Sequence, residues 1–264
     1  MRRLHVFPNG YYNYKKNRKN AKHKQKSKLL KLIKTMYHAA DGTPGYRTMQ
    51  KALKNNGILL SPQTVRQYMN VELGLKSITR KKKKRYVPGP DAYALFDNLL
   101  EQNFKADTKN TKWCIDFTYT YFKNKKRYNC TIIDLYDRRV VASVNSNRIN
   151  TQLAIDTLNK AFERSGKKGG MILHSDRGSQ FTSKVFVEYC KECGVIQSMS
   201  KPGCPYDNAP MERYFNTLKS EHLNIHEYET EEDLYWGINR YAYGYYNNQR
   251  PHTYNDGLPP AKVA

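Results

Sequence analysis

The chain has 264 residues, with 46 Lys and Arg against 23 Asp and Glu, which gives a formal net charge of +23. No run of about 18 apolar residues occurs, so the sequence predicts no membrane-spanning helix. The start MRRLHVFPNG lacks the apolar stretch of a secretory signal. Five cysteines in a chain without an export signal favour a reducing cytoplasm and no disulfide framework.

The positive charge is concentrated in the first third of the chain. Residues 1–90 contain 23 Lys and Arg and two acidic residues, a net charge of +21, whereas residues 91–264 carry a net charge of +2. Such a basic segment favours a polyanionic partner, because neutralising phosphates releases counterions. Charge alone leaves DNA and RNA undecided, and a solvated basic surface is the alternative.

The basic third predicts an arm followed by a helix-turn-helix domain. The arm is assigned to residues 1–27. The run KKNRKNAKHKQKSK (15–28) cannot bury a core and is expected to be mobile or nascent-helical. Apolar spacing then predicts helices at about 29–40, 46–55 and 63–73, the last one capped by Ser61. We assign residues 28–79 to this domain; a generic three-helix bundle with a polar surface is the alternative. Its third helix is expected to present four polar residues to DNA: Gln63, Arg66, Gln67 and Asn70.

The remainder of the chain predicts an α/β domain. Residues 80–104 are interpreted as a basic linker, RKKKKR followed by PGP, and a connecting helix from about Ala92. Residues 105–264 predict a mixed sheet covered by helices. The expected strands are 113–121, 128–135, 140–144, 171–173 and 195–199, and the expected helices are 151–164, 183–193, 209–223 and 231–247.

Three carboxylates at the ends of these elements are the candidate catalytic residues. Asp116 lies on the polar face of a strand whose other face is aromatic, Asp176 follows a short apolar strand, and Glu212 lies in the first turn of a helix. A carboxylate on a buried strand is costly unless it is paired or binds a cation, and oxygen ligands suit Mg²⁺. Taken singly, Asp176 could form a turn and Glu212 could be a helix N-terminal charge.

Other polar residues of this region have simpler interpretations. Asp134 and Asp137 flank a strand end, where Asp137 and Arg138 predict a paired turn. His174 could support a ligand of Asp176, although a lone strand histidine is more often structural.

The spacing of the three carboxylates and the sequence segments around them resemble a known family. Asp176 and Glu212 are separated by 35 residues, which is similar to the DD(35)E triad of retroviral integrases and bacterial transposases. Four segments resemble the OrfB-type catalytic protein of the IS-three family of insertion sequences: WCIDFTY (113–119), HSDRGSQFTS (174–183), SMSKPGCPYDNAPMERYFNTLKSE (198–221) and YNNQRPH (246–252). GYRTMQKAL (45–53) and SPQTVRQYM (61–69) resemble that family's helix-turn-helix segment.

The resemblance implies an RNase H-like integrase core with a mixed five-stranded sheet, acting on DNA. Asp116, Asp176 and Glu212 would be both catalytic and metal-binding, with two Mg²⁺ ions for which Mn²⁺ could substitute. Lys219 would hold DNA near the scissile phosphate, with a solvated surface lysine as the alternative. Asn208 would position water or a carboxylate, with a helix cap as the equally good alternative.

The resemblance also implies partners and a reaction. We expect a bacterial, nucleoid-associated transposase that binds double-stranded DNA at element ends and target, cleaves strands and transfers them, and forms a homo-oligomer on DNA. An upstream OrfA-type protein is a possible fusion or partner. The alternatives are a catalytically inactive or domesticated DNA-binding relative, and a nuclease that cleaves without joining.

Overall fold

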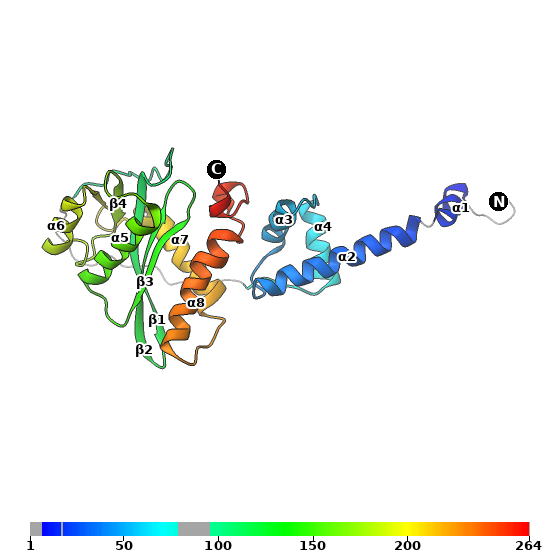
Figure 1. Cartoon of the computed structure of the whole chain (residues 1–264). Helices are drawn as coiled ribbons and strands as arrows, with labels where there is room; N and C mark the ends of the chain where they lie inside the picture. The colour runs from blue at the N-terminus through cyan, green and yellow to red at the C-terminus, as the bar shows by residue number, and fades with distance from the viewer. Residues whose placement is uncertain (1–6, 17, 79–95, 264) are drawn as a thin grey trace. The chain divides into compact units, whose positions relative to one another are not determined.

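The computed structural model describes residues 7–16, 18–78 and 96–263, and the chain divides into two compact units, Met1–Thr79 and Arg80–Ala264 (Figure 1). The basic linker run 80–85 and the start of the expected connecting helix lie outside the described residues. In the described ranges, no helix is long and apolar enough to cross a membrane.

The first unit is all-helical. Its helices are α1 (Pro8–Lys15), α2 (Arg18–Ala39), α3 (Tyr46–Asn55) and α4 (Pro62–Arg66), which continues as the π-helical segment η2 (Gln67–Glu72). One apolar core joins α2, α3, α4 and η2 through five buried side chains: Ile33, Met49, Leu53, Val65 and Met69. The backbone N–H of Thr64 donates to Oγ of Ser61, which confirms the cap expected at the start of the third helix.

The helix expected from about residue 29 begins earlier in the chain than predicted. α2 begins at Arg18 and passes without a break into the apolar part of the helix, so residues 18–28 are helical, which was one of the two expected alternatives. Residues 15–28 contain neither Pro nor Gly, and Lys is a good helix former, so this composition permits a helix. An ion pair of 2.8 Å between Lys26 and Glu72 also ties this part of α2 to η2. The expected boundary between residues 27 and 28 therefore falls inside a helix.

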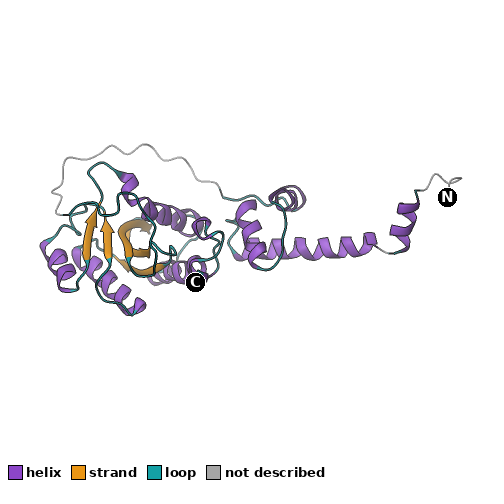
Figure 2. Ribbon diagram, turned by 90° about the horizontal axis from the view of Figure 1, so that it is seen from above, coloured by secondary structure: helices purple, strands orange, loops and turns teal. Residues whose placement is uncertain are grey.

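The second unit is built on a five-stranded mixed sheet in the order β3-β2-β1-β4-β5 (Figures 1 and 2). The strands are β1 (Lys112–Phe122), β2 (Lys125–Asp134), β3 (Val140–Ser146), β4 (Ile172–Ser175) and β5 (Ile196–Met199). The first three are antiparallel, and β1, β4 and β5 run parallel to one another. The expected antiparallel hairpins followed by parallel strands are confirmed.

Helices cover both faces of this sheet (Figure 2). α5 (Thr151–Ser165) and α6 (Lys184–Glu192) cover the face that carries Trp113 and Ile115. The other face, which carries Cys114, is covered by α7 (Ala209–Leu218), η4 (Lys219–Leu223), α8 (Glu231–Asn239) and η5 (Arg240–Tyr246). Three short 3-10 turns complete the unit: η3 (Pro205–Asn208), η6 (Thr253–Asn255) and η7 (Pro260–Lys262).

The expected connecting helix is not present in residues 96–104. This segment consists of bends and turns, and Glu101 and Gln102 have φ values of 43° and 62°, which no α-helix accepts. Residues 97–102, which we call the strap, instead bond to distant parts of the unit. Leu99 N–H donates to Oγ of Ser198, and the carbonyl of Asp97 accepts from Met199 N–H.

Candidate active site

Asp116 is brought to the centre of the sheet by β1. β4 pairs with β1 only at residues 112–114, so Asp116 lies just beyond the end of this pairing, on the face covered by α7. The side chain is half-buried; its Oδ1 accepts from Phe117 N–H at 2.7 Å and its Oδ2 from Asn208 at 3.1 Å. Burial raises the pKa of Asp116 well above its usual range, and the negative charges of Asp176 and Glu212 raise it further.

Asp176 directly follows the last residue of β4, the parallel neighbour of β1. Cys114 of β1 pairs with His174 of β4, and each aspartate follows two residues later. Oδ1 of Asp176 accepts from Gly178 N–H at 2.9 Å, and a Cβ at residue 178 would lie only 3.0 Å from that oxygen. A side chain at residue 178 would therefore crowd that oxygen and Oε1 of Gln180. Asp176 is reached by solvent, yet the surrounding protein desolvates it enough to raise its pKa.

Glu212 is carried by the first turn of α7 and is exposed. Its neighbours Met211, Tyr214 and Phe215 are buried against the sheet, so the helix is fixed while Glu212 points outward. The effect of its charge on the pKa of Asp116 shows that the two carboxylates lie within electrostatic range of each other. The structure thus brings all three expected carboxylates to one region.

The donor set fits a hard cation in chemistry, but its geometry is not that of a closed metal site. Among the described residues, Asp116 and Asp176 form no ion pair with Lys or Arg. The two negative charges repel each other, and a bound cation would reduce this repulsion. However, no three His, Cys, Asp or Glu side chains in the described ranges are placed to hold one metal ion together.

Asn208 supports Asp116 and does not cap α7. It occupies the N-cap position of that helix, but its side chain makes no capping hydrogen bond; Nδ2 donates to Oδ2 of Asp116. Oδ1 of Asn208 is buried without a hydrogen-bond partner in the described structure. Of the two interpretations left open by the sequence, the structure therefore favours the positioning of a carboxylate.

Lys219 follows α7 directly and reaches toward β1. Its Nζ lies 4.9 Å from the ring centroid of Tyr119, and its charge lowers the pKa of Asp116 against the larger effect of burial. Lys219 therefore lies in the same region as the carboxylates. The aromatic partner Tyr119 was not singled out by the sequence, although its place three residues after Asp116 on an exposed strand end could have indicated it.

The four polar residues expected to read DNA lie in the other unit. Gln63, Arg66, Gln67 and Asn70 are all exposed, while Val65 and Met69 between them are buried. The helix formed by α4 and η2 therefore presents one polar surface to solvent. These residues are not described in relation to the carboxylates, since each unit is placed only by itself.

Comparison with known proteins identifies the family. An HTH-like domain model matches residues 24–83, and two integrase core domain models match residues 106–205 and 193–260. The transposase of insertion sequence element IS904 from Lactococcus lactis is 33% identical over 232 residues, which cover 88% of this chain and 91% of that protein. The chain belongs to the IS3 family of insertion-sequence transposases.

A second insertion-sequence relative agrees with this assignment. The putative transposase InsK of IS150 from Escherichia coli is 32% identical over 232 residues, covering 88% of this chain and 81% of that protein. The magnesium complex of the HTLV-2 integrase catalytic core domain is 20% identical, covers 58% of this chain and 95% of that chain, and has a TM-score of 0.48. The expected RNase H-like integrase core with a preceding helix-turn-helix domain is confirmed by the family models.

One residue of this transposase was missed by the sequence analysis. Asp207, directly before Asn208, is buried and accepts hydrogen bonds from Asn98, from Gln102 and from the backbone N–H of Lys201. Burial by itself would raise its pKa, but these hydrogen bonds outweigh it and the pKa is lowered. The signal was available: an acidic residue in a loop of small residues, next to Asn208.

His174 is a structural residue of the transposase core. Its two ring nitrogens lie 2.9 Å from Oγ of Ser198 and 3.2 Å from Oγ of Ser200. Desolvation lowers the pKa of His174 to about 4, so the ring is neutral at physiological pH. It holds the ends of β4 and β5 together.

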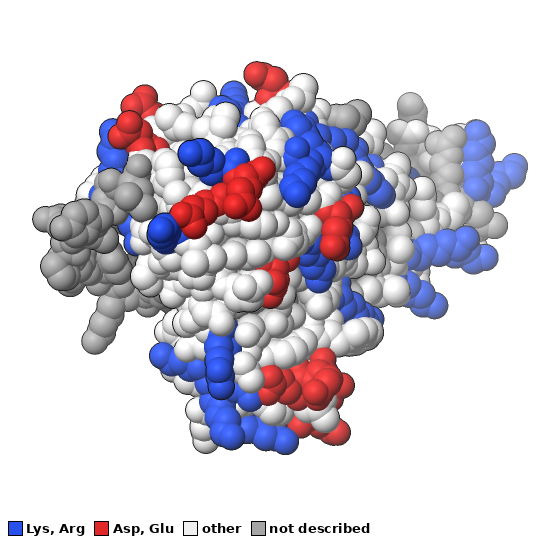
Figure 3. All heavy atoms as spheres, turned by 60° about the vertical axis from the view of Figure 1, so that its left-hand side comes forward, with Lys and Arg blue, Asp and Glu red and all other residues white. Residues whose placement is uncertain are grey.

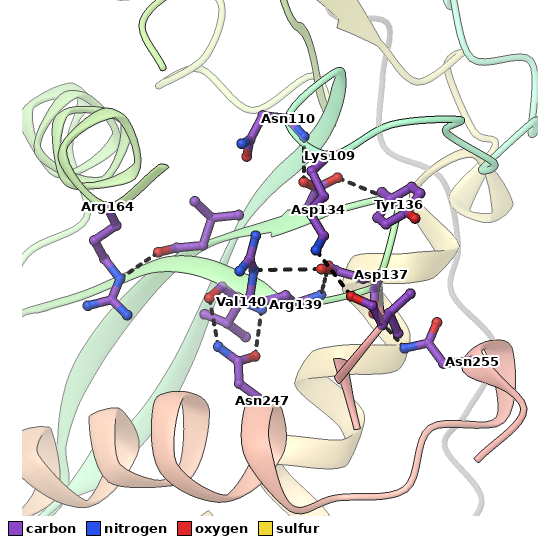
Figure 4. A network of polar contacts seen from close by, with 12 residues as sticks. Lys109, Asn110, Asp134, Tyr136, Asp137, Arg139, Val140, Arg164, Asn247 and Asn255 are labelled. Carbon is purple, nitrogen blue, oxygen red and sulfur yellow. Dashed lines mark hydrogen bonds and ion pairs between the residues drawn. The ribbon is translucent and has the colours of Figure 1, made fainter. Parts of the chain in front are cut away.

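Asp134 and Asp137 form the turn between β2 and β3 and belong to no catalytic cluster (Figure 4). Asp134 accepts from the backbone N–H groups of Asn110 and Tyr136, and Asp137 accepts from Arg139 N–H. The expected pairing of Asp137 with Arg138 was wrong, because the side chain 3.8 Å from Asp137 is that of Arg139. The carbonyl of Phe104 accepts from Arg138 instead.

Proposed function

We propose that this transposase binds the ends of an insertion sequence, cleaves phosphodiester bonds there and transfers the strands to target DNA. The observation that carries the proposal is the placement of Asp116 on β1 and of Asp176 directly after the neighbouring parallel strand β4, with Glu212 within electrostatic range of Asp116. The fold holds these carboxylates close together although their negative charges repel, which indicates a site that binds a cation. The family of the chain supports the same reaction class.

Asp116, Asp176 and Glu212 would hold Mg²⁺, with two ions and substitution by Mn²⁺ as part of the proposal. When bound, the metal would supply stabilisation of charge on phosphate oxygens and activation of an attacking water or DNA 3′-hydroxyl. Asn208 fixes the orientation of Asp116 through its hydrogen bond. Lys219 offers a positive charge to a DNA phosphate near the carboxylates.

Residues 28–79 and 105–264 would divide the work between end recognition and chemistry. The exposed residues Gln63, Arg66, Gln67 and Asn70 suit contacts to bases and phosphates in a major groove. We propose a homo-oligomer on DNA, since an element has two ends and each needs a set of carboxylates. An OrfA-type protein as partner or fusion, and action at the bacterial nucleoid, belong to the same proposal.

A strand-transfer assay tests the function. Labelled duplex DNA that carries the element end is incubated with the full chain, target DNA and Mg²⁺, and cleaved and joined products are separated. We expect both products from the wild type, none from Asp116→Asn, and both from the matched control Asp156→Asn, an exposed aspartate of α5. Equal products from wild type and Asp116→Asn would contradict the proposal, and cleavage without joining would favour a nuclease.

A further inference from the structure

β1 has a free edge beside the carboxylates. It runs to Phe122, but β4 pairs only with residues 112–114, and among the described residues no other strand pairs with this edge farther along. Phe117 is stacked on Phe181 under the helical layer. The next two rings on that face, Tyr119 and Tyr121, lie beyond this layer and are 47% and 60% exposed.

The two tyrosines form one aromatic surface with basic neighbours. Their ring centroids are 5.9 Å apart in an edge-to-face arrangement. Nζ of Lys126, from β2, lies 5.0 Å from the Tyr119 centroid, and Nζ of Lys219 lies 4.9 Å from it. The ring thus joins the strand hairpin to the element that follows α7. We call Tyr119, Tyr121, Lys126 and Lys219 the tyrosine platform.

The hairpin beside the platform is basic, and the acidic start of α8 lies next to it. Figure 3 shows basic and acidic side chains gathered beside one another at the lower end, which in Figure 1 is formed by the β1–β2 hairpin and the start of α8. The acidic start of α8 is engaged in part by Arg127, which pairs with Glu231. Lys123 and Lys125 lie in the same hairpin as Lys126 and add to its positive charge.

Exposed aromatic rings among lysines are suited to unpaired nucleotides. Every base has a face that can stack on a tyrosine, and lysines bind the phosphates between the bases. Bases in a duplex are already stacked on each other, so an aromatic platform selects a strand that has been opened. Tyr119 lies three residues after Asp116, about 10 Å along the strand and on its other face. Lys219 connects the two, since it contacts the Tyr119 ring and its charge acts on Asp116.

We propose that the tyrosine platform binds unpaired nucleotides of the DNA strand next to the scissile phosphate, by stacking bases on Tyr119 and Tyr121. This inference rests on the proposed function, because it places the reacting phosphate at Asp116. It assigns to the transposase a site for opened DNA in addition to duplex recognition. Lys126 and Lys219 would hold the backbone of the opened strand.

Photocrosslinking with the full chain tests the platform directly. The probe is an element-end duplex with a three-nucleotide single-stranded end that carries 5-iododeoxyuridine, and the matched probe carries the same base within the duplex. Irradiation joins iodouracil to a stacked aromatic side chain, and mass spectrometry identifies the peptide. We expect the single-stranded probe to crosslink to Tyr119 or Tyr121 and the duplex probe to crosslink there at least about fivefold less.

Variants separate stacking from charge and folding. Tyr119→Ala combined with Tyr121→Ala should reduce this crosslink about 5- to 100-fold, the effect of losing one base stack. Tyr119→Phe should retain it, because the ring face remains. Tyr254→Ala is the control, since Tyr254 is 40% exposed and lies away from the platform. Its ring centroid is 3.9 Å from Cζ of Arg138, a residue that follows the opposite end of β2. Thermal unfolding of each variant checks that it is folded.

The outcomes are distinguishable from those of the proposed function. The crosslink needs no metal and no cleavage, so it can be measured in Asp116→Asn. Equal crosslinking of the two probes, or an unchanged crosslink in the double variant, would overturn the platform even where strand transfer proceeds. A double variant with normal crosslinking but a changed oligomeric state would also overturn it, and would assign the tyrosines to contact between copies of the chain.

Discussion

Asn208 donates a hydrogen bond of 3.1 Å to Oδ2 of Asp116, a residue 92 positions earlier in the chain. The bond joins the loop before α7 to the middle of the sheet. It orients the one candidate carboxylate that is half-buried in the core. The loop that leads into the Glu212 helix is thereby tied to Asp116.

Replacing Asn208 should slow the reaction without unfolding the transposase. Asn208→Ala removes the group that orients Asp116, and we expect cleavage of element-end DNA to fall about 10- to 100-fold, the usual effect of losing a partner of a metal ligand. Asn208→Asp should be at least as slow, because it adds negative charge beside Asp116. Rates are measured over a series of Mg²⁺ concentrations. Asn216→Ala, farther along α7, is the control, and a change of less than twofold in Asn208→Ala would contradict this role.

Asp116 should destabilise the metal-free protein at neutral pH. Its pKa in the folded state is raised above the unfolded value, so the folded protein binds more protons and stability falls as the pH rises through that interval. Asp116→Asn should therefore raise the Tm at pH 7, by roughly 2–4 °C for each kcal/mol of repulsion that is relieved, and should change it little below about pH 3.8. Mg²⁺ should raise the Tm of the wild type and not that of Asp116→Asn. Calorimetry with and without EDTA measures both effects.

Lys219 and Lys126 should differ in their effect on Asp116 although both lie over Tyr119. The charge of Lys219 lowers the pKa of Asp116, whereas Lys126 is not among the groups that act on it. Lys219→Ala should move the acidic limb of the pH–rate profile to higher pH and slow cleavage at neutral pH. Lys126→Ala should leave that limb in place. The profile is measured by single-turnover cleavage at saturating Mg²⁺, and an equal shift in both variants would contradict the distinction.

Asp207 should contribute to stability in a pH-dependent way. Asp207→Ala leaves the donors of Asn98 and Gln102 without their acceptor and should lower the free energy of unfolding by about 1–3 kcal/mol at pH 7. Because hydrogen bonds lower the pKa of Asp207 in the folded state, its contribution is complete above the unfolded value of about 3.9 and is lost as the pH falls through the folded value. Urea unfolding at pH 7 and pH 3 tests this. The exposed Asp107→Ala is the control and should have little effect at either pH.

Binding of element ends should depend steeply on salt. The net charge of +21 in residues 1–90 predicts that log Kd changes with log salt concentration with a slope near 0.9 per phosphate contacted. Arg66→Ala should weaken binding by about 1–3 kcal/mol if the side chain reads a base, whereas Lys54→Ala, at the end of α3, should have a smaller effect. Fluorescence anisotropy between about 50 and 200 mM salt measures the salt slope and the effects of the variants. A flat response would contradict the assignment of the basic region.

Local signals were sufficient for much of the fold. The alternation around Asp116 predicted a strand with a polar and an aromatic face, and Ser61 followed by Pro62 predicted a capped helix; both depend on neighbours within a few residues. Asp176 and Glu212 could be found because each stands at the end of a regular element, and Asp116 because it interrupts the apolar composition of a strand. Their proximity followed from the parallel pairing of β1 with β4.

Signals that depend on distant partners could not be used in this way. The spacing of Leu99 and Leu100 suits a helix, but the segment is held in turns by Ser198 and Asp207, which lie about a hundred residues farther on. The sequence could not decide whether Asn208 caps α7 or positions a carboxylate, because that depends on its hydrogen bond to Asp116. A sequence pattern records what a side chain can do, and the tertiary contacts decide between the options.

The strap changes where a working core fragment has to begin. Asn98 and Gln102 supply two of the hydrogen bonds that Asp207 accepts, and Leu99 is bonded to Ser198 at the end of β5. The integrase core match starts only at residue 106. A protein shortened to that boundary would retain Asp116, Asp176 and Glu212 but lose the hydrogen bonds that hold Asp207, the residue before Asn208. A fragment intended for crystallisation or assay should therefore begin no later than residue 96.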